Sequence, residues 1–418
     1  MKGASVPSTG RGELGVLASI LALAVLARLV AMHVLHEPIV SDAAAYLEMA
    51  RTLAGPGPMR DTYGNAAFYS PGYPFALAGA YALGVTGLAA AQAINLFLGL
   101  ISTLLMYLVT RRAGGRPFAA LVAAAAYAVL IPAVAGTAFV QRENLSVPLL
   151  LLFILCVIEL ARTRRPNSVA AITGMVYGAG LLAGASIILT AAAAIVAMLW
   201  RKPDLRAAAT AAATFVAGAA LVVTPWLAHV DHELGRPVLT TNGPFNLYVG
   251  NNPAADGRFV SLRDTPIGAA WHGLRAQEGE LGATDQLGRL AVAHIRAHPV
   301  ETVALSLKKL VLFWLPDLPD NADTDHGAAI NALRWLDVVQ YLLLAGLGLV
   351  AILRWRTRSQ GERLVIITLG AFWAIHAAAY VMPRYRLPAL PLLAVLATGV
   401  ITPASRRPAE PRPLAAEA

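Results

Sequence analysis

Two carboxylates and four cations in this sequence have the chemistry needed to handle a phosphate-linked substrate. Each of the six lies in or next to an apolar run, where a polar side chain would sit between water and lipid. Cations can hold a lipid phosphate and stabilise the negative charge that develops on it as it leaves. A nearby carboxylate can act as a general base on a hydroxyl group. The carboxylates are Asp42 and Glu143, and the cations are Lys308, Lys309, Arg384 and Arg386.

Structural roles are the alternatives for the same residues. Asp42 could serve only as the N-cap of the helix that follows it, with Ser41 as the other choice of cap. Glu143 lies at the start of an apolar run, where a carboxylate interacts favourably with the dipole of the helix. Its role could be this interaction or that of a second active-site acid, and we leave both open. The two lysines could snorkel, and the two arginines could anchor a membrane boundary. We favour catalysis for Asp42 and phosphate binding for at least one of the arginines.

The composition places these residues in a membrane protein. Of 418 residues, 57% are hydrophobic and only 14% are charged, and the mean hydropathy is +0.61. Soluble domains carry about a quarter charged residues. Apolar runs near the roughly 20 residues that span a bilayer recur along the chain. The sequence therefore predicts an all-α polytopic membrane protein.

The net charge of +9 is explained by topology rather than by nucleic acid. The basic residues occur in short groups at the ends of apolar runs, as the positive-inside rule expects for cytoplasmic loops. They do not form an amphipathic surface with interleaved aromatic residues, so no nucleic-acid partner is predicted. The groups are Arg111, Arg112 and Arg116; Arg162, Arg164 and Arg165; Arg201, Lys202 and Arg206; Arg354, Arg356 and Arg358; and Arg406 and Arg407.

About ten spans follow from these runs and groups, with both termini in the cytoplasm. Basic residues flank the stretch 168–200 at both ends, so it must cross an even number of times, as two short helices broken near Gly184 would do. Arg28 interrupts the first span and is expected to pack in the bundle or snorkel rather than contact substrate. The other expected spans are 14–35, 88–110, 117–137, 145–161, 207–228, 332–353, 364–381 and 387–401.

Two long stretches, 36–87 and 229–331, are expected on the outer side. The first contains an amphipathic helix at 42–53, whose apolar residues recur at helical spacing, and a short surface helix at 75–83. The second mixes acidic and basic residues and is expected to form a small α-rich lobe with an amphipathic helix at 300–314. We treat 1–403 as one transmembrane domain and 404–418, rich in proline and alanine, as a disordered cytoplasmic tail.

Motifs for other chemistry are missing from the sequence. Cys156 is the only cysteine, so no disulfide framework can form within the chain. His294 and His298 have i,i+4 spacing, which we interpret as two polar side chains on the protein surface rather than a metal site. There is no phosphate loop, dinucleotide fingerprint or serine-nucleophile elbow. We therefore predict neither a cofactor nor a metal site. For Asn251 and Asn252 we favour a role in a turn, with contact to a sugar as the alternative.

Several short motifs, in their order and placement, resemble the GT-C glycosyltransferases. The most similar branch is the family-39-like group that includes protein mannosyltransferases and the aminoarabinose transferase of lipid A. The likeness extends to Pro391. The motifs are Ser41-Asp42 with Tyr46 after the first span, Ser70-Pro-Gly-Tyr-Pro74, Arg142-Glu143-Asn144, Pro225-Trp226, Asn246-Leu-Tyr-Val-Gly-Asn-Asn-Pro253 and Pro383-Arg-Tyr-Arg-Leu-Pro388.

The resemblance implies a GT-C-like bundle of about ten transmembrane helices, with outer-face juxtamembrane helices and one long outer loop. It also implies a polyprenyl-phosphate-linked sugar donor, used at the outer face of a membrane. Asp42 would be the catalytic base, Glu143 a second acid, and Arg384 or Arg386 a contact of the donor phosphate, with Lys308 and Lys309 as further candidates. Candidate contacts of the sugar or acceptor are Tyr46, Tyr73, Arg142, Asn251 and Asn252.

A transferase that moves a sugar to a glycan, lipid or protein is the leading hypothesis. The alanine-rich composition is typical of a GC-rich bacterial source, so the expected location is the bacterial plasma membrane. A transporter or lipid-linked-sugar flippase is the rival, and an inactive structural relative is a third reading. Transporters often place charges at the midplane of the membrane. Here the charges gather at one outer face, which favours the enzyme.

Overall fold

Helices are the regular elements of the described chain. The computed structural model describes residues 10–200, 204–319 and 327–402, and these contain sixteen α-helices and no strand. A single isolated β-bridge joins Arg258 to Val381. The all-α fold predicted from the sequence is confirmed. The expected tail 404–418 and the basic residues Arg201, Lys202, Arg406 and Arg407 lie outside the described residues.

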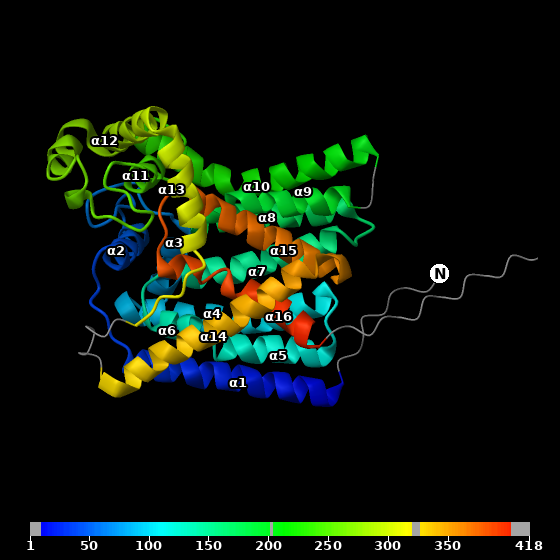
Figure 1. The fold of residues 1–418 in the computed structure, drawn as a ribbon. Coiled ribbons are helices and arrows are strands. Elements are labelled where there is room, and N and C mark those ends of the chain that lie inside the picture. Colours follow the sequence, from blue (N-terminus) through cyan, green and yellow to red (C-terminus); the bar gives the residue numbers. More distant parts are fainter. Residues whose placement is uncertain (1–9, 201–203, 320–326, 403–418) are drawn as a thin grey trace, which may run out of the picture.

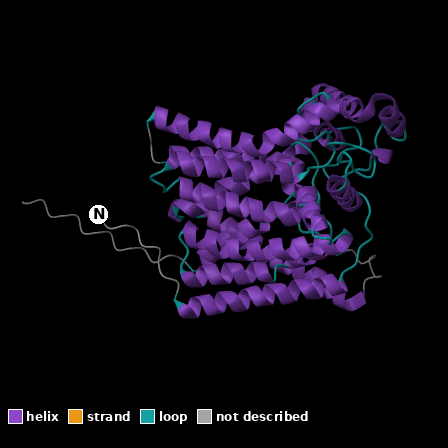
Figure 2. Cartoon of the chain, turned by 180° about the vertical axis from the view of Figure 1, so that it is seen from behind, coloured by secondary structure: helices purple, strands orange, loops and turns teal. Residues whose placement is uncertain are grey.

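The helical segments of the bundle lie side by side (Figures 1 and 2), and their ranges correspond to the expected spans. Five are long and apolar enough to cross a membrane on their own, and a bent pair is a sixth. The chain is therefore a multi-pass membrane protein. The five are α1 (Arg11–Val34), α4 (Gly87–Ala113), α7 (Glu143–Leu160), α10 (Leu205–Leu234) and α14 (Gly327–Leu353). The bent pair is α5 (Pro117–Ala128) with α6 (Ile131–Ala135), and the shorter segments are α8 (Pro166–Ala183), α9 (Ala191–Leu199), α15 (Gln360–Ala374) and α16 (Leu390–Ile401).

The third expected span, 117–137, is broken rather than continuous. The chain bends by 55° between α5 and α6. The break frees backbone groups that have no water to bind in an apolar bundle, so side chains must satisfy them. Gln340 does this with both ends of its amide: Nε2 donates to Val129 O at 3.1 Å, and Oε1 accepts from Ile131 N at 2.9 Å. The span expected at 117–137 is therefore present as a bent pair, and the bend was not predicted because Gln340 lies far away in the sequence.

Arg28 packs inside the bundle, as expected. Its side chain is fully buried. Its Nη1 donates to Ala24 O at 3.1 Å and to Ala128 O at 3.3 Å, where α5 ends. Its guanidinium lies 5.5 Å from the centre of the Tyr127 ring, a cation–π distance. Arg28 therefore ties α1 to the break in the third span and does not reach the cavities described below.

One end of the bundle carries the elements outside the spans (Figure 1). There α2 (Asp42–Ala54) and α3 (Gly72–Ala82) follow α1, in the stretch predicted to hold two surface helices. The rest of this end is the lobe, which we define as α11 (Asn242–Gly250), α12 (Ala270–Ala297) and α13 (Pro299–Leu312). The amphipathic helix expected at 300–314 is α13, and α10 extends six residues beyond its expected end at 228.

The end of α11 packs directly on the chain that follows α15. A Cβ on Gly250 would lie 2.3 Å from Ala379 O, so a side chain there would force the two segments apart. The close approach brings Asn246 of α11 to Tyr380, whose hydroxyl donates to Asn246 Oδ1 at 3.2 Å. Two parts of the sequence that are far apart therefore meet beside the start of α2.

Candidate active site

Asp42 is the first residue of α2 and follows a strained residue. Ser41 has a φ of +52°, the only positive φ of a non-glycine residue in the described chain. Such a conformation costs about 1–3 kcal/mol and tends to occur at functional sites. No side-chain bond caps the start of α2. The N-cap role considered for Asp42 and Ser41 is therefore not what their side chains do here.

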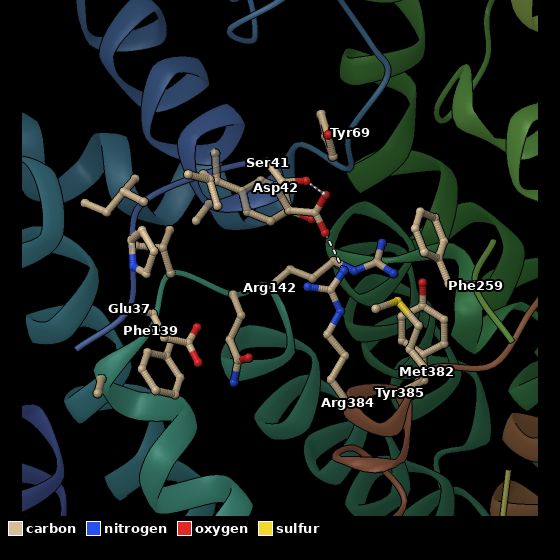
Figure 3. A pocket seen from close by; sticks show the side chains of 18 of the residues that line it. Glu37, Ser41, Asp42, Tyr69, Phe139, Arg142, Phe259, Met382, Arg384 and Tyr385 are labelled. Atoms are coloured by element: carbon tan, nitrogen blue, oxygen red, sulfur yellow. Dashed lines mark hydrogen bonds and ion pairs between the residues drawn. The ribbon is translucent and has the colours of Figure 1, made fainter. Parts of the chain in front are cut away.

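The Asp42 carboxylate instead forms an ion pair with Arg384 (Figure 3). Arg384 Nη2 donates to Asp42 Oδ2 across 342 residues of sequence. Arg384 belongs to the 3-10 helix η7 (Pro383–Arg386), which precedes α16. About a third of each side chain remains exposed, 38% for Arg384 and 28% for Asp42. The pair is therefore accessible to a ligand in the adjoining cavity.

Arg142 and Glu143 complete a cluster of four charges. Arg142 immediately precedes α7, and Glu143 is its first residue. Arg142 Nε lies 3.7 Å from Glu143 Oε1, and Arg142 Nη1 is 3.5 Å from Ser70 Oγ, both loose contacts. In Figure 3 the Arg142 and Arg384 side chains lie next to each other below Asp42. Burial alone would lower the pKa of Arg384, but Glu143 and Asp42 outweigh it and raise that pKa.

A cavity of about 460 Å³ opens beside this cluster. It is within the range of about 300–1,000 Å³ typical of small-molecule sites. Asp42, Arg142 and Arg384 all line it, and aromatic rings form much of the remaining wall. Several of these rings pack edge to face, for example Tyr46 on Tyr69 at 5.5 Å between ring centres. The aromatic lining residues are Tyr46, Phe68, Tyr69, Phe139, Phe245, Phe259, Tyr380 and Tyr385.

A second cavity, of about 330 Å³, shares Arg142 as a wall. Glu143 lines it with its largely buried carboxylate. The rest of the lining is rich in hydroxyl and amide groups that could bind a polyol. These are the side chains of Ser70, Ser146, Ser186, Thr240, Asn242, Asn246, Tyr380 and Tyr385. Asn242, Asn246, Tyr380 and Tyr385 line both cavities and were not identified from the sequence.

Arg386 points away from Asp42. Its Nη1 donates to Leu315 O, its Nε donates to Pro383 O at 3.4 Å, and its guanidinium lies 4.8 Å from the Tyr341 ring centre. It shares only a third cavity, of about 360 Å³, with Arg384. Of the two arginines predicted to bind phosphate, Arg384 is therefore the one that the structure places in the charge cluster.

Lys309 and the two asparagines are not part of the cluster. Lys309 is fully buried, and its Nζ donates to Asn251 Oδ1 at 3.1 Å. Asn251 Nδ2 in turn donates to Leu247 O and Ala378 O, both at 2.8 Å. Asn252 bonds to the backbone at Tyr248 O, at 2.9 Å. None of these residues lines the two cavities beside Arg142, so the structure favours the turn role for the asparagines. Lys308 is exposed on the other flank of α13.

Tyr46 and Tyr73 differ in position. Tyr46 lines the larger cavity, as a substrate contact would. Tyr73 is fully buried and donates from its hydroxyl to Asn95 Oδ1 at 2.8 Å, which fastens α3 to α4. Of the described residues, no group of three or more His, Cys, Asp or Glu is arranged to hold a metal ion.

The Lys309 ammonium predicts an unusual pH dependence of stability. Burial lowers its pKa from 10.5 to about 8, and α13 lies outside the spans. Between these values the unfolded chain still binds a proton that the folded chain has lost, so stability rises with pH, by about 3 kcal/mol in all. In thermal unfolding, the stability of wild type relative to that of Lys309→Met should increase as the pH rises from 7 to 10. Lys308→Met, its exposed neighbour, should show no such trend, and equal pH profiles for both variants would contradict the prediction.

Glu280 fixes the loop that forms one wall of the larger cavity. It follows Gly279, whose φ of +68° interrupts α12. Its carboxylate accepts from Ala66 N at 2.7 Å, Ala67 N at 3.1 Å and Thr241 Oγ1 at 2.6 Å. Phe68 and Tyr69 follow directly and line the cavity. Sequence analysis did not identify this role, because Ala66 and Ala67 lie more than 200 residues from Glu280 in the chain.

Glu280→Gln is therefore expected to loosen this loop. An amide offers one acceptor oxygen to three donors and brings an N–H toward them, at a cost of about 1.5–3 kcal/mol. The thermal unfolding midpoint should fall, and proteolysis of the 61–70 loop should quicken. Glu278→Gln, the same change at an exposed position two residues away, is the control. Equal melting of the two variants would show that Glu280 does not hold the loop.

Comparisons with known proteins bear on the fold. Residues 69–229 match the family model described as dolichyl-phosphate-mannose-protein mannosyltransferase. No curated protein sequence matches the chain. Solved structures of the oligosaccharyltransferase of Archaeoglobus fulgidus have the same architecture as this chain over 92–93% of the chain's length. The chain has the GT-C fold.

Two of these GT-C structures illustrate the match. The enzyme tethered to an acceptor peptide containing the NVT sequon is 15% identical, with a TM-score of 0.54, and 93% of this chain covers 49% of that one. AglB in complex with an inhibitory peptide and a dolichol-phosphate is 16% identical, with a TM-score of 0.50, and 93% of this chain covers 50% of that one. The chain thus spans about half the length of these archaeal proteins. The likeness supports the GT-C fold expected from the sequence.

Proposed function

We propose that this protein is a membrane glycosyltransferase that moves a sugar from a polyprenyl-phosphate donor to an acceptor hydroxyl. The observation that carries the proposal is the Asp42 carboxylate paired with Arg384 and beside Arg142, at the mouth of a cavity at the end of a GT-C bundle. The matched mannosyltransferase family is named for a dolichyl-phosphate sugar, and AglB was solved with a dolichol-phosphate. Both support a lipid-phosphate donor here.

The charges fit a displacement at the sugar C1. The bond between C1 and the phosphate oxygen breaks, and the phosphate keeps the electron pair. Arg384 and Arg142 would stabilise the charge on that leaving group, since a guanidinium matches phosphate geometry through paired N–H donors. Asp42 would take the proton of the acceptor hydroxyl as its oxygen bonds to C1. The hydroxyl-rich cavity behind Arg142 is suited to a sugar ring, with Glu143 as an acceptor of its hydrogen bonds.

The arrangement of the spans indicates on which side of the membrane the site lies. We infer that the lobe and the Asp42 cluster face the periplasm or exterior of a bacterial plasma membrane, with both termini in the cytoplasm. The basic groups at 111–116 and 162–165 support this orientation, because they follow α4 and α7 at the end of the bundle away from the lobe. The acceptor is a glycan, lipid or protein carrying a free hydroxyl.

The proposal is tested with the full chain in lipid nanodiscs. Tritiated polyprenyl-phosphate sugars are offered one at a time with a mixture of glycan, lipid and peptide acceptors. We expect at least one donor to release polyprenyl phosphate, with label appearing in an acceptor. If none is consumed, but labelled lipid crosses the bilayer of proteoliposomes in a protein-dependent way, the protein is a flippase instead.

A further inference from the structure

We propose that the Asp42 carboxylate occupies the anion site of Arg384 whenever no donor is bound, so that the donor phosphate must displace it before Asp42 can act as a base. This inference rests on the proposed function and concerns the control of the same site. Binding of the donor would then release the base, and the acceptor hydroxyl could be deprotonated only after the donor is in place.

The first observation is that Arg384 has N–H donors that Asp42 does not use. A guanidinium has five N–H donors in a rigid fork. Of these, Nη2 binds Asp42, whereas Nε is buried without a hydrogen-bond partner in the described chain. A carboxylate that uses one donor leaves the fork incomplete. A phosphate group in place of Asp42 could accept from two N–H groups at once, which the Asp42 carboxylate does not do here. Arg384 is therefore better matched to a phosphate than to the partner it has.

The second observation is the local charge. Arg142 and Arg384 are neighbours of like charge, and Asp42 and Glu143 balance them. A phosphate entering this cluster would meet both carboxylates as well as both guanidinium groups. Its attraction is greatest if Arg384 exchanges Asp42 for the phosphate and Asp42 turns to another partner. The acceptor hydroxyl is that partner in the proposed reaction.

The third observation is the conformation that holds Asp42 in place. The strained Ser41 fixes the start of α2 so that the carboxylate faces Arg384. The Ser41 hydroxyl is 3.4 Å from Asp42 Oδ1 and can keep that oxygen oriented when Oδ2 is released. A change of partner then needs only a rotation of the side chain, and α2 can remain where it is.

The test measures binding of tritiated polyprenyl monophosphate, without any turnover, to the detergent-purified full chain. Asp42→Asn removes the internal competitor, so it should bind the lipid phosphate about tenfold more tightly than wild type, or better. Arg384→Gln should bind about tenfold more weakly. Glu37→Gln removes an equal charge from an exposed position on the wall of the same cavity, and should change binding by less than about threefold. Asp42→Ala repeats the first measurement if Asp42→Asn does not fold.

Each result has a distinct meaning. Equal or weaker binding by Asp42→Asn overturns the inference and leaves the proposed function standing. Tightening by Glu37→Gln as large as by Asp42→Asn also overturns it, since the gain would then reflect the loss of any negative charge near the cavity. Binding that is the same in wild type and Arg384→Gln, or no binding by any variant, contradicts the proposed function itself.

Discussion

Replacing Asp42 with asparagine is expected to lower the rate of sugar transfer by about 10²–10⁴-fold. Asparagine has the shape of aspartate but cannot take a proton from the acceptor hydroxyl. The loss should appear in kcat rather than in the KM for the donor, because the donor phosphate is held by the arginines. The measurement is transfer from the active polyprenyl-phosphate sugar with purified variants of equal thermal stability.

A matched control for this change lies on the same helix. Glu48 of α2 pairs with Arg51 at 2.6 Å and does not line the cavities beside Arg142. Glu48→Gln removes one carboxylate from α2, as Asp42→Asn does, and should retain nearly full transfer. Asp42→Asn with activity close to that of Glu48→Gln would rule Asp42 out as the base.

Replacing Arg384 with lysine is expected to reduce transfer by about 10²–10³-fold, although the positive charge remains. Lysine is a point charge and cannot offer the paired N–H donors that match a phosphate. Single-turnover cleavage of the donor is the measurement, because it isolates departure of the phosphate from product release.

Arg386→Lys is the matched comparison, two residues away in the same 3-10 helix. Arg386 is bonded to Leu315 O and Pro383 O rather than to Asp42. Its replacement should lower thermal stability with a smaller effect on donor cleavage. A greater loss of cleavage in Arg386→Lys than in Arg384→Lys would reverse our assignment of the phosphate contact.

Much of the fold could be predicted because a bilayer constrains both the length of an apolar span and the placement of basic residues. Apolar runs of fixed length and basic groups at their ends indicated the spans, and Gly184 was correctly expected to break the stretch 168–200. The break in the third span could not be foreseen. It depends on Gln340 and Arg28, which bind freed backbone groups from other helices.

The site was predictable where charge and position coincide. Asp42, Glu143 and Arg384 were chosen because each lies at the edge of a span, and the structure brings them together. Lys309 illustrates the opposite case. It adjoins Lys308, and successive helical residues differ by about 100° in direction, so one is buried and the other exposed. Which of the two lysines is buried depends on how α13 packs, and the local sequence pattern does not indicate this.

The most direct test of the account separates the base from the leaving-group contact by chemical rescue. Azide is a nucleophile that needs no proton removed, so it can replace acceptor and base together. In Asp42→Ala, added azide should restore release of polyprenyl phosphate from the donor and form a glycosyl azide. In Arg384→Ala it should not, since the phosphate would still leave without stabilisation. Rescue of both variants to the same extent, or of Arg384→Ala alone, would contradict the roles assigned to Asp42 and Arg384.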